Sequence, residues 1–140
     1  MSNGPRPSEL CLLSDLPAKE VGDKVRFLGC VASYTAASGV LTLEHQSPGQ
    51  NQRFRALVDV NLVLETLSWE QTRPGEWVNV IGYVTENPGQ PSADSPPGTD
   101  LTTACVQAIL LWSAGPVNPQ QYEESVKALA ETDQVSHSGG

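Results

Sequence analysis

The sequence is poor in the residues that metal centres and disulfide frameworks require. It has two histidines and three cysteines, and no Cys-x-x-Cys pair occurs. A structural zinc site needs four such ligands at short spacings, and a disulfide framework needs cysteines in pairs. We therefore expect no metal and no cofactor. Cys30 and Cys105 lie in apolar runs, where a thiol is usually a small buried hydrophobe.

Positive charge is scarce as well. The 140 residues include 8 Lys and Arg against 16 Asp and Glu, for a net charge of −8. Proteins that bind nucleic acid without a partner do so with Lys and Arg, which displace counterions from the phosphates. Any nucleic-acid contact is therefore expected to be local, weak or shared with a partner. The acidic balance suits docking to a basic subunit, and it equally suits simple solubility.

Signatures of catalysis and of membrane insertion are missing. The sequence has no glycine-rich phosphate loop and no nucleophile elbow, and its two histidines, His45 and His137, are too far apart to build a triad. It also has no signal segment and no long apolar run. We expect a soluble intracellular protein that is not an enzyme and does not engage a membrane.

What the sequence does contain is a series of strand-like segments. Alternation of apolar and polar residues predicts strands at 24–34, 40–45, 53–60, 76–85 and 102–112. The stretch 9–17 could add a short closing strand. Between the third and fourth strands, residues 61–71 change to a helical period, with Asn61 as the expected N-cap. The proline-rich stretch 86–101 is expected to be a loop.

The clearest local signal is a C-terminal helix over residues 118–131. Asn118 can cap it, Pro119 suits the first helical position, and Gln121 stands three residues after the cap. Residues 132–140 are expected to be a disordered polar tail and residues 1–8 a flexible lead. The prediction is therefore one domain over residues 9–131.

This order of elements predicts an all-β barrel with flanking helices. Five strands with a helix between the third and fourth fit a single OB-fold, a five-stranded Greek-key barrel, here followed by the C-terminal helix. Gly29 lies in the middle of the long first strand, which must bend to pair at both ends. Another small all-β barrel remains the alternative at this point.

Four segments carry a family resemblance: KVRFLGCVASY, GVLTLEH, RALVDVNLVLETL and GEWVNVIGYV. Followed by a strand and a capped helix, they resemble the fungal TEN subunit, the smallest subunit of the CST telomere-capping complex. That subunit is similar in plan to the small OB subunit of replication protein A. The resemblance covers about residues 8–132. It implies a nuclear protein of telomeric chromosome regions that forms a heterodimer with the STN subunit and assembles with a larger third subunit. Single-stranded telomeric DNA is then a weak or auxiliary ligand.

The C-terminal helix is the expected partner-binding element. Tyr122, Val126 and Leu129 fall on one stripe, with Ala130 beside them. Such a stripe can pack under its own barrel or against a helix of another subunit. The family resemblance favours the partner, with Tyr122 as the anchor because tyrosine buries a large area and keeps a polar tip.

Single-strand binding by an OB-fold requires aromatic platforms and cations along one groove. The alternative is that Arg53 and Arg55 are solvated edge charges and Tyr83 is core. The alternative function is an autonomous single-stranded nucleic-acid-binding module of the replication protein A type; a hydrolytic or carbohydrate-acting OB domain lacks a recognisable site. The candidate nucleic-acid residues are Arg26, Tyr34, Arg53, Arg55 and Tyr83.

Overall fold

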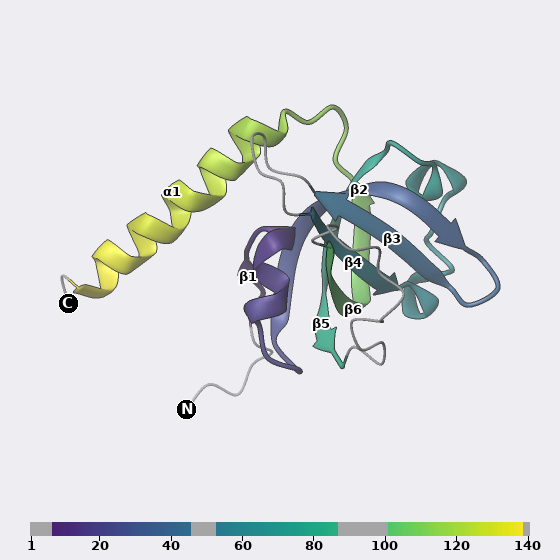
Figure 1. Cartoon of the computed structure of the whole chain (residues 1–140), viewed down its shortest axis with the longest axis horizontal. Helices are drawn as coiled ribbons and strands as arrows, with labels where there is room; N and C mark the ends of the chain where they lie inside the picture. The colour runs from purple at the N-terminus through teal and green to yellow at the C-terminus, as the bar shows by residue number, and fades with distance from the viewer. Residues whose placement is uncertain (1–6, 46–52, 87–100, 139–140) are drawn as a thin grey trace.

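The computed structural model describes residues 7–45, 53–86 and 101–138 (Figure 1). The predicted loop at 86–101 lies almost wholly outside the described residues, as do most of the predicted lead and the last two residues of the predicted tail. The elements in chain order are β1 (Glu9–Leu10), η1 (Leu13–Ala18), β2 (Lys24–Thr35), β3 (Val40–His45), β4 (Arg53–Asp59), η2 (Asn61–Val63), η3 (Trp69–Thr72), β5 (Trp77–Thr85), β6 (Leu101–Ser113) and α1 (Pro119–Ser138).

Five of the strands close into a barrel. The strand order in the sheet is β1-β2-β3-β4-β6-β5. The additional pairing of β2 with β5 closes the barrel, and β1 lies outside it as an extra strand on β2. The first half of β2 pairs with β5 and the second half with β3, so β2 must bend sharply at its middle. Gly29 sits at that bend, where a Cβ atom would lie 2.8 Å from the Cβ of Leu43. The predicted five-stranded OB barrel is confirmed.

The barrel interior is filled by the apolar residues of the strand alternation. Phe27 is completely buried, and Phe54 is partly buried against the same core. Cys11 belongs to this core, whereas Cys30 and Cys105 are only partly buried. The expectation that Cys30 and Cys105 are buried was wrong, because Cys30 pairs in register with Trp77 and Cys105 with Thr85, residues that are themselves only partly covered.

The helix predicted at 61–71 does not form. Two short 3₁₀ turns, η2 and η3, replace it. Asn61 does not cap a helix: its backbone N–H and its side chain both donate to Oδ1 of Asp59, and the side chain also donates to the carbonyl of Ser38. The two bonds to Asp59 compete locally with helix formation. The bond to Ser38, far away in sequence, holds the segment against the β2–β3 hairpin.

The predicted closing strand at 9–17 is shorter than expected. Only Glu9 and Leu10 pair, in parallel with β2, and the chain then turns into η1. Asp15 favours this turn because its carboxylate accepts the backbone N–H of Leu12. Leu13 and Leu16 point inward from η1 and are each 1% exposed, so η1 packs on the core that a longer strand would have left open.

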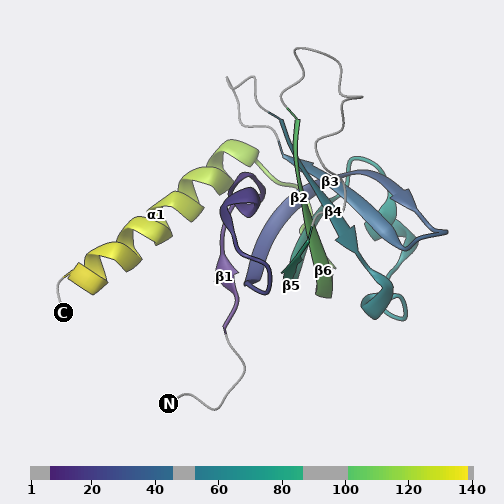
Figure 2. The ribbon, with the colours of Figure 1, turned by 60° about the horizontal axis from the view of Figure 1, so that its bottom comes forward.

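Helix α1 starts as predicted and ends later. Asn118 caps it, since its Oδ1 accepts the backbone N–H of Gln121 at 3.2 Å. The predicted end at 131 was wrong: α1 continues to Ser138, so residues 132–138 of the predicted tail are helical. Figures 1 and 2 both show the first turns of α1 beside the barrel and the later turns projecting away from it. Among the described residues, no helix is long and apolar enough to cross a membrane.

Candidate partner-binding and nucleic-acid surfaces

The first half of the predicted helix stripe rests on the chain's own barrel. Val126 is 6% exposed, and Tyr122 is partly buried. Val126 lies outside the main core cluster, together with the buried Leu12 and Leu28. Val126 is on α1, Leu12 lies just before η1, and Leu28 is on β2. The burial of these three side chains indicates a small second apolar layer under the helix.

The phenol of Tyr122 is enclosed at this boundary. Its hydroxyl is buried near the Leu28 backbone and forms no short, well-aligned hydrogen bond among the described residues. Burial raises the pKa of Tyr122 to about 12, and the nearby Cys11 thiol acts in the same direction. The Leu28 backbone and the Arg26 charge lower it by less. Tyr122 therefore faces β2 of its own chain.

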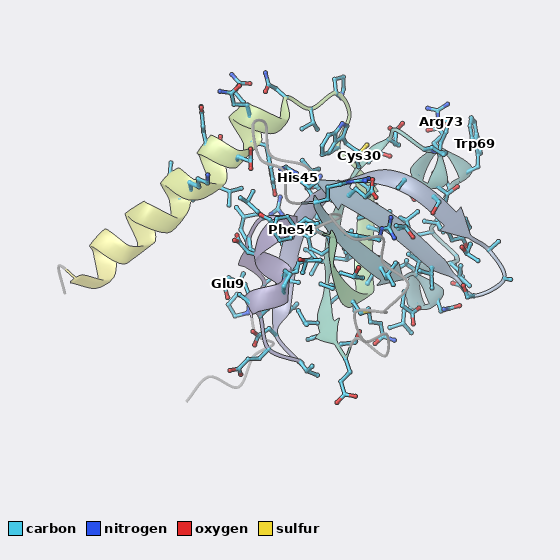
Figure 3. All side chains as sticks on the ribbon, viewed as in Figure 1. Glu9, Cys30, His45, Phe54, Trp69 and Arg73 are labelled. Atoms are coloured by element: carbon cyan, nitrogen blue, oxygen red, sulfur yellow. The ribbon has the colours of Figure 1, made fainter. Side chains whose placement is uncertain are left out.

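A polar contact lies next to this apolar layer. Glu123, on the first turns of α1, has its Oε1 3.5 Å from Nε2 of His45 at the end of β3. The His45 ring also meets Trp77 of β5 edge-on, with ring centroids 6.1 Å apart. Figure 3 shows His45 at the side of the barrel that α1 approaches. The start of α1 is thus fixed by apolar and polar contacts together.

The second half of the stripe is uncovered. Leu129 is 58% exposed, although it lies only one turn beyond the buried Val126. The side chain of Ala130 lies outside the described residues. Figure 2 shows that the later turns of α1 project from the barrel, which agrees with the exposure of Leu129 in the chain taken alone. An apolar residue in this position on a projecting helix is available for another helix.

Two of the nucleic-acid candidates share the outer face of the barrel beside α1. Arg26 pairs in register with Ile81, and Tyr83 pairs with Lys24, so the two candidates occupy neighbouring rows. The Arg26 guanidinium covers the ring of Trp112 on β6, 5.4 Å from its centroid. Leu110, opposite Ile81 on β6, is 55% exposed. This face is mainly apolar and aromatic, with cationic side chains at one side.

Arg53 and Arg55 lie elsewhere and are already engaged. Both contact the same carboxylate oxygen of Glu44, at 3.5 Å and 3.2 Å respectively. The Nε atom of Arg55 is buried without a hydrogen-bond partner among the described residues. The Glu44 carboxylate neutralises much of the positive potential here. These two arginines should therefore attract a phosphate less strongly than two unpaired arginines would.

The remaining aromatic candidate, Tyr34, and the exposed Trp69, which was not a candidate, lie apart from both groups. Tyr34 packs partly buried against the barrel core. Trp69 is 69% exposed and stacks with Arg73 at 5.1 Å, at the end of the molecule away from α1 (Figure 3). The structure thus separates the five nucleic-acid candidates into the Arg26–Tyr83 face, the Arg53–Arg55 pair and the inward Tyr34. They do not form one groove.

Comparison with known proteins decides between a general OB module and a specific family. Residues 1–127 match the Ten1 family, which is described as "Telomere capping, CST complex subunit". The chain belongs to the Ten1 family. No curated protein matches the sequence.

Two solved structures support this membership. The Schizosaccharomyces pombe Stn1–Ten1 complex is similar with a TM-score of 0.64 at 25% identity, over 91% of this chain and 96% of that one. Telomere-capping protein Ten1 from the same organism gives 0.62 at 25% identity, over 89% and 99%. An Entamoeba histolytica asparaginyl-tRNA synthetase, at 12% identity and a TM-score of 0.54, covers 81% of this chain and 25% of its own, and shares only the fold. The Ten1 family is one of telomere-capping subunits, and no enzyme family is identified.

Three residues that shape the candidate surfaces, Glu44, His45 and Glu123, were not identified from the sequence. Glu44 follows strand alternation as an outward residue, so its contact with two arginines of β4 required the strand register. His45 could have been noticed, because it continues the inward series Leu41 and Leu43. Glu123 stands next to Tyr122 and three residues before Val126, on the buried side of this Ten1-family helix.

Proposed function

We propose that this chain is the Ten1-type subunit that pairs with an Stn1-type partner through the projecting half of α1. The observation that carries the proposal is Leu129, an exposed apolar side chain on a helix that leaves its own barrel. The similarity to the S. pombe Stn1–Ten1 complex supports the identity of the partner. Helix-on-helix packing buries such a stripe with favourable apolar contact.

The roles within the stripe divide at Val126. Tyr122 and Val126 hold the start of α1 on the barrel, since both are covered by this chain. Leu129, with Ala130 beside it, contacts the partner. Arg26 extends the same surface, because it lies near Tyr122 and covers Trp112. The partner then contacts a helix and the neighbouring outer face of the barrel.

The role at DNA is auxiliary. With a net charge of −8 and with Arg53 and Arg55 engaged by Glu44, the chain alone is poorly suited to bind phosphates. We infer that single-stranded telomeric DNA is bound mainly through the assembled complex, which includes the larger third subunit. From membership of a telomere-capping family, we infer a non-catalytic subunit that acts in the nucleus at chromosome ends.

Coexpression with the Stn1-type partner tests the helix. Leu129→Glu should reduce the affinity by about 30-fold or more, on the precedent of central interface residues. Lys127→Ala, an exposed position on the same helix, is the matched control and should recover the partner normally. Thermal unfolding of each isolated variant should match the parent chain. Full partner recovery by Leu129→Glu would exclude this docking surface.

A further inference from the structure

The most exposed large apolar side chain among the described residues is that of Trp69 on η3. It is 69% exposed. Figure 3 shows it with Arg73 at the end of the molecule away from α1. Tryptophan is usually well covered because its ring is large and mostly apolar, and exposed tryptophans are enriched at the centres of protein interfaces. A single exposed apolar residue is common, however, so the surroundings of Trp69 must decide its role.

The turn that carries Trp69 is fixed to the barrel. The hydroxyl of Thr72 donates to the carbonyl of Trp69 at 2.9 Å. Directly after η3, the backbone N–H of Gly75 donates to the carbonyl of Val31 on β2, and the N–H of Val31 donates to the carbonyl of Glu76, both at 2.8 Å. Trp69 is therefore presented outward by a backbone that is already ordered, so binding at this point costs little further ordering.

Arg73 holds the indole ring in one orientation. Its guanidinium lies 5.1 Å from the centroid of the Trp69 ring, and its Nη2 lies 3.3 Å from Oε2 of Glu76. Because Trp69 is still 69% exposed with this contact in place, much of the ring remains open. The face of an indole attracts cations more strongly than that of any other aromatic side chain.

The charge of this region also favours a cation. The connection between β4 and β5, residues 60–76, carries three carboxylates, those of Glu65, Glu70 and Glu76, and one guanidinium, that of Arg73. Glu65 and Glu70 are exposed, and within the described part of the chain neither has a salt bridge. The adjoining part of β2, residues 29–35, contains no Lys or Arg. Negative charge thus lies beside an open aromatic ring.

We propose that Trp69, Glu70 and Arg73 form a docking surface, the η3 surface, for a basic segment of a partner protein. An Arg or Lys side chain of that segment packs on the open part of the Trp69 ring, and Glu70 pairs with a neighbouring cation. Single-stranded nucleic acid fits less well, because its phosphates would face net negative charge. Since the η3 surface and α1 lie at different ends of the molecule, this inference does not depend on the proposed function (Figure 3).

Three synthetic peptides of equal length, titrated into the isolated full chain, test the proposal. They alternate leucine with arginine, with glutamine or with glutamate. The arginine peptide should shift the NMR signals of the Trp69 indole N–H and of the η3 amides. The glutamine peptide should bind more weakly, because it lacks the charge attraction, and the glutamate peptide should not bind.

Two variants and two matched controls locate the binding. Trp69→Ala should weaken binding of the arginine peptide by about tenfold or more, on the precedent of interface tryptophans. Glu70→Gln should weaken it by about threefold, as expected for one exposed ion pair. Val21→Ala and Glu20→Gln change an exposed apolar residue and an exposed carboxylate outside the η3 surface, and both should bind like the parent. All four side chains are exposed, so thermal unfolding should show every variant folded.

Each of three results would overturn the proposal. The first is that the arginine peptide does not bind, or binds no better than the glutamate peptide. The second is that Trp69→Ala binds the arginine peptide like the parent, which would mean that the net charge of −8 attracts it without a site. The third is that a single-stranded DNA oligonucleotide shifts the Trp69 indole signal and the arginine peptide does not, which would make this a nucleic-acid surface.

Discussion

The Nη2 atom of Arg55 lies 3.2 Å from Oε1 of Glu44, and Arg53 approaches the same oxygen. One carboxylate therefore faces both cations of β4. Glu44→Gln releases both arginines, so it should strengthen the binding of the isolated chain to single-stranded DNA. The slope of log affinity against log salt concentration should steepen by the equivalent of up to about two phosphate contacts. A fluorescence-anisotropy titration across a salt series measures both quantities.

The matched control for that experiment is Glu76→Gln. Glu76 pairs with Arg73 at the η3 end of the molecule and leaves the β4 arginines untouched. If Glu44→Gln and Glu76→Gln give the same affinity and salt slope, then Arg53 and Arg55 do not contribute to a nucleic-acid surface. A charge change of one unit is common to both variants, so only position distinguishes them.

Cys11 should be the slowest of the three thiols to react with an alkylating reagent. Burial raises the pKa of all three and brings that of Cys11 to about 12, and Cys11 is only 4% exposed. The thiolate is the reactive form, so iodoacetamide at about pH 8 should modify Cys30 and Cys105 well before Cys11. Peptide mass spectrometry over time gives the order. Early modification of Cys11 would mean that η1 opens frequently.

Tyr122 should make the fold sensitive to alkali. Burial raises its pKa from 10.0 to about 12, so the folded state favours the neutral phenol. The stabilisation is complete below about pH 10 and is lost as the pH rises toward about pH 12, because the unfolded chain releases the proton first. Tyr122→Phe should reduce this loss in urea unfolding at about pH 11.

At neutral pH the same variant should be close to the parent in stability. Its buried hydroxyl lies near the Leu28 backbone but forms no short, well-aligned hydrogen bond with the described residues, so removing it should cost little stability. The ring itself is retained. A loss of more than about 2 kcal/mol in Tyr122→Phe would mean that the hydroxyl has a strong partner.

The strands were predictable because apolar alternation along each strand follows from a barrel with one buried face. All five predicted barrel strands are present with bounds shifted by one residue at most. The segment 61–71 was not predictable in the same way. Its apolar spacing is compatible with a helix, but Asn61 bonds to Ser38, which is 23 residues away in sequence. A long-range bond of this kind leaves no local pattern.

The candidate surfaces show the same limit. Asn118 as the cap of α1 was predictable, because capping is decided within a few residues. Whether Val126 or Leu129 is covered depends on where α1 leaves the barrel, and the side-chain period is the same for both. Likewise, the engagement of Arg53 and Arg55 by Glu44 depends on strand register. Charge type is visible in the sequence, but charge pairing is not.

Gly82 provides a sharp test of the barrel geometry itself. It lies at the irregularity in the β5–β6 pairing, where a Cβ atom would be 2.3 Å from the backbone oxygen of Gln107. Backbone cannot rotate away as a side chain can, so Gly82→Ala should destabilise the fold by about 3 kcal/mol or more through overpacking. Gly29→Ala meets mainly the side chains of Leu43 and Leu13, at 2.8 Å and 3.0 Å, which can shift. It should therefore be the milder of the two variants in urea unfolding. If Gly82→Ala is the milder one, β5 and β6 do not approach each other at this point as the structure has them.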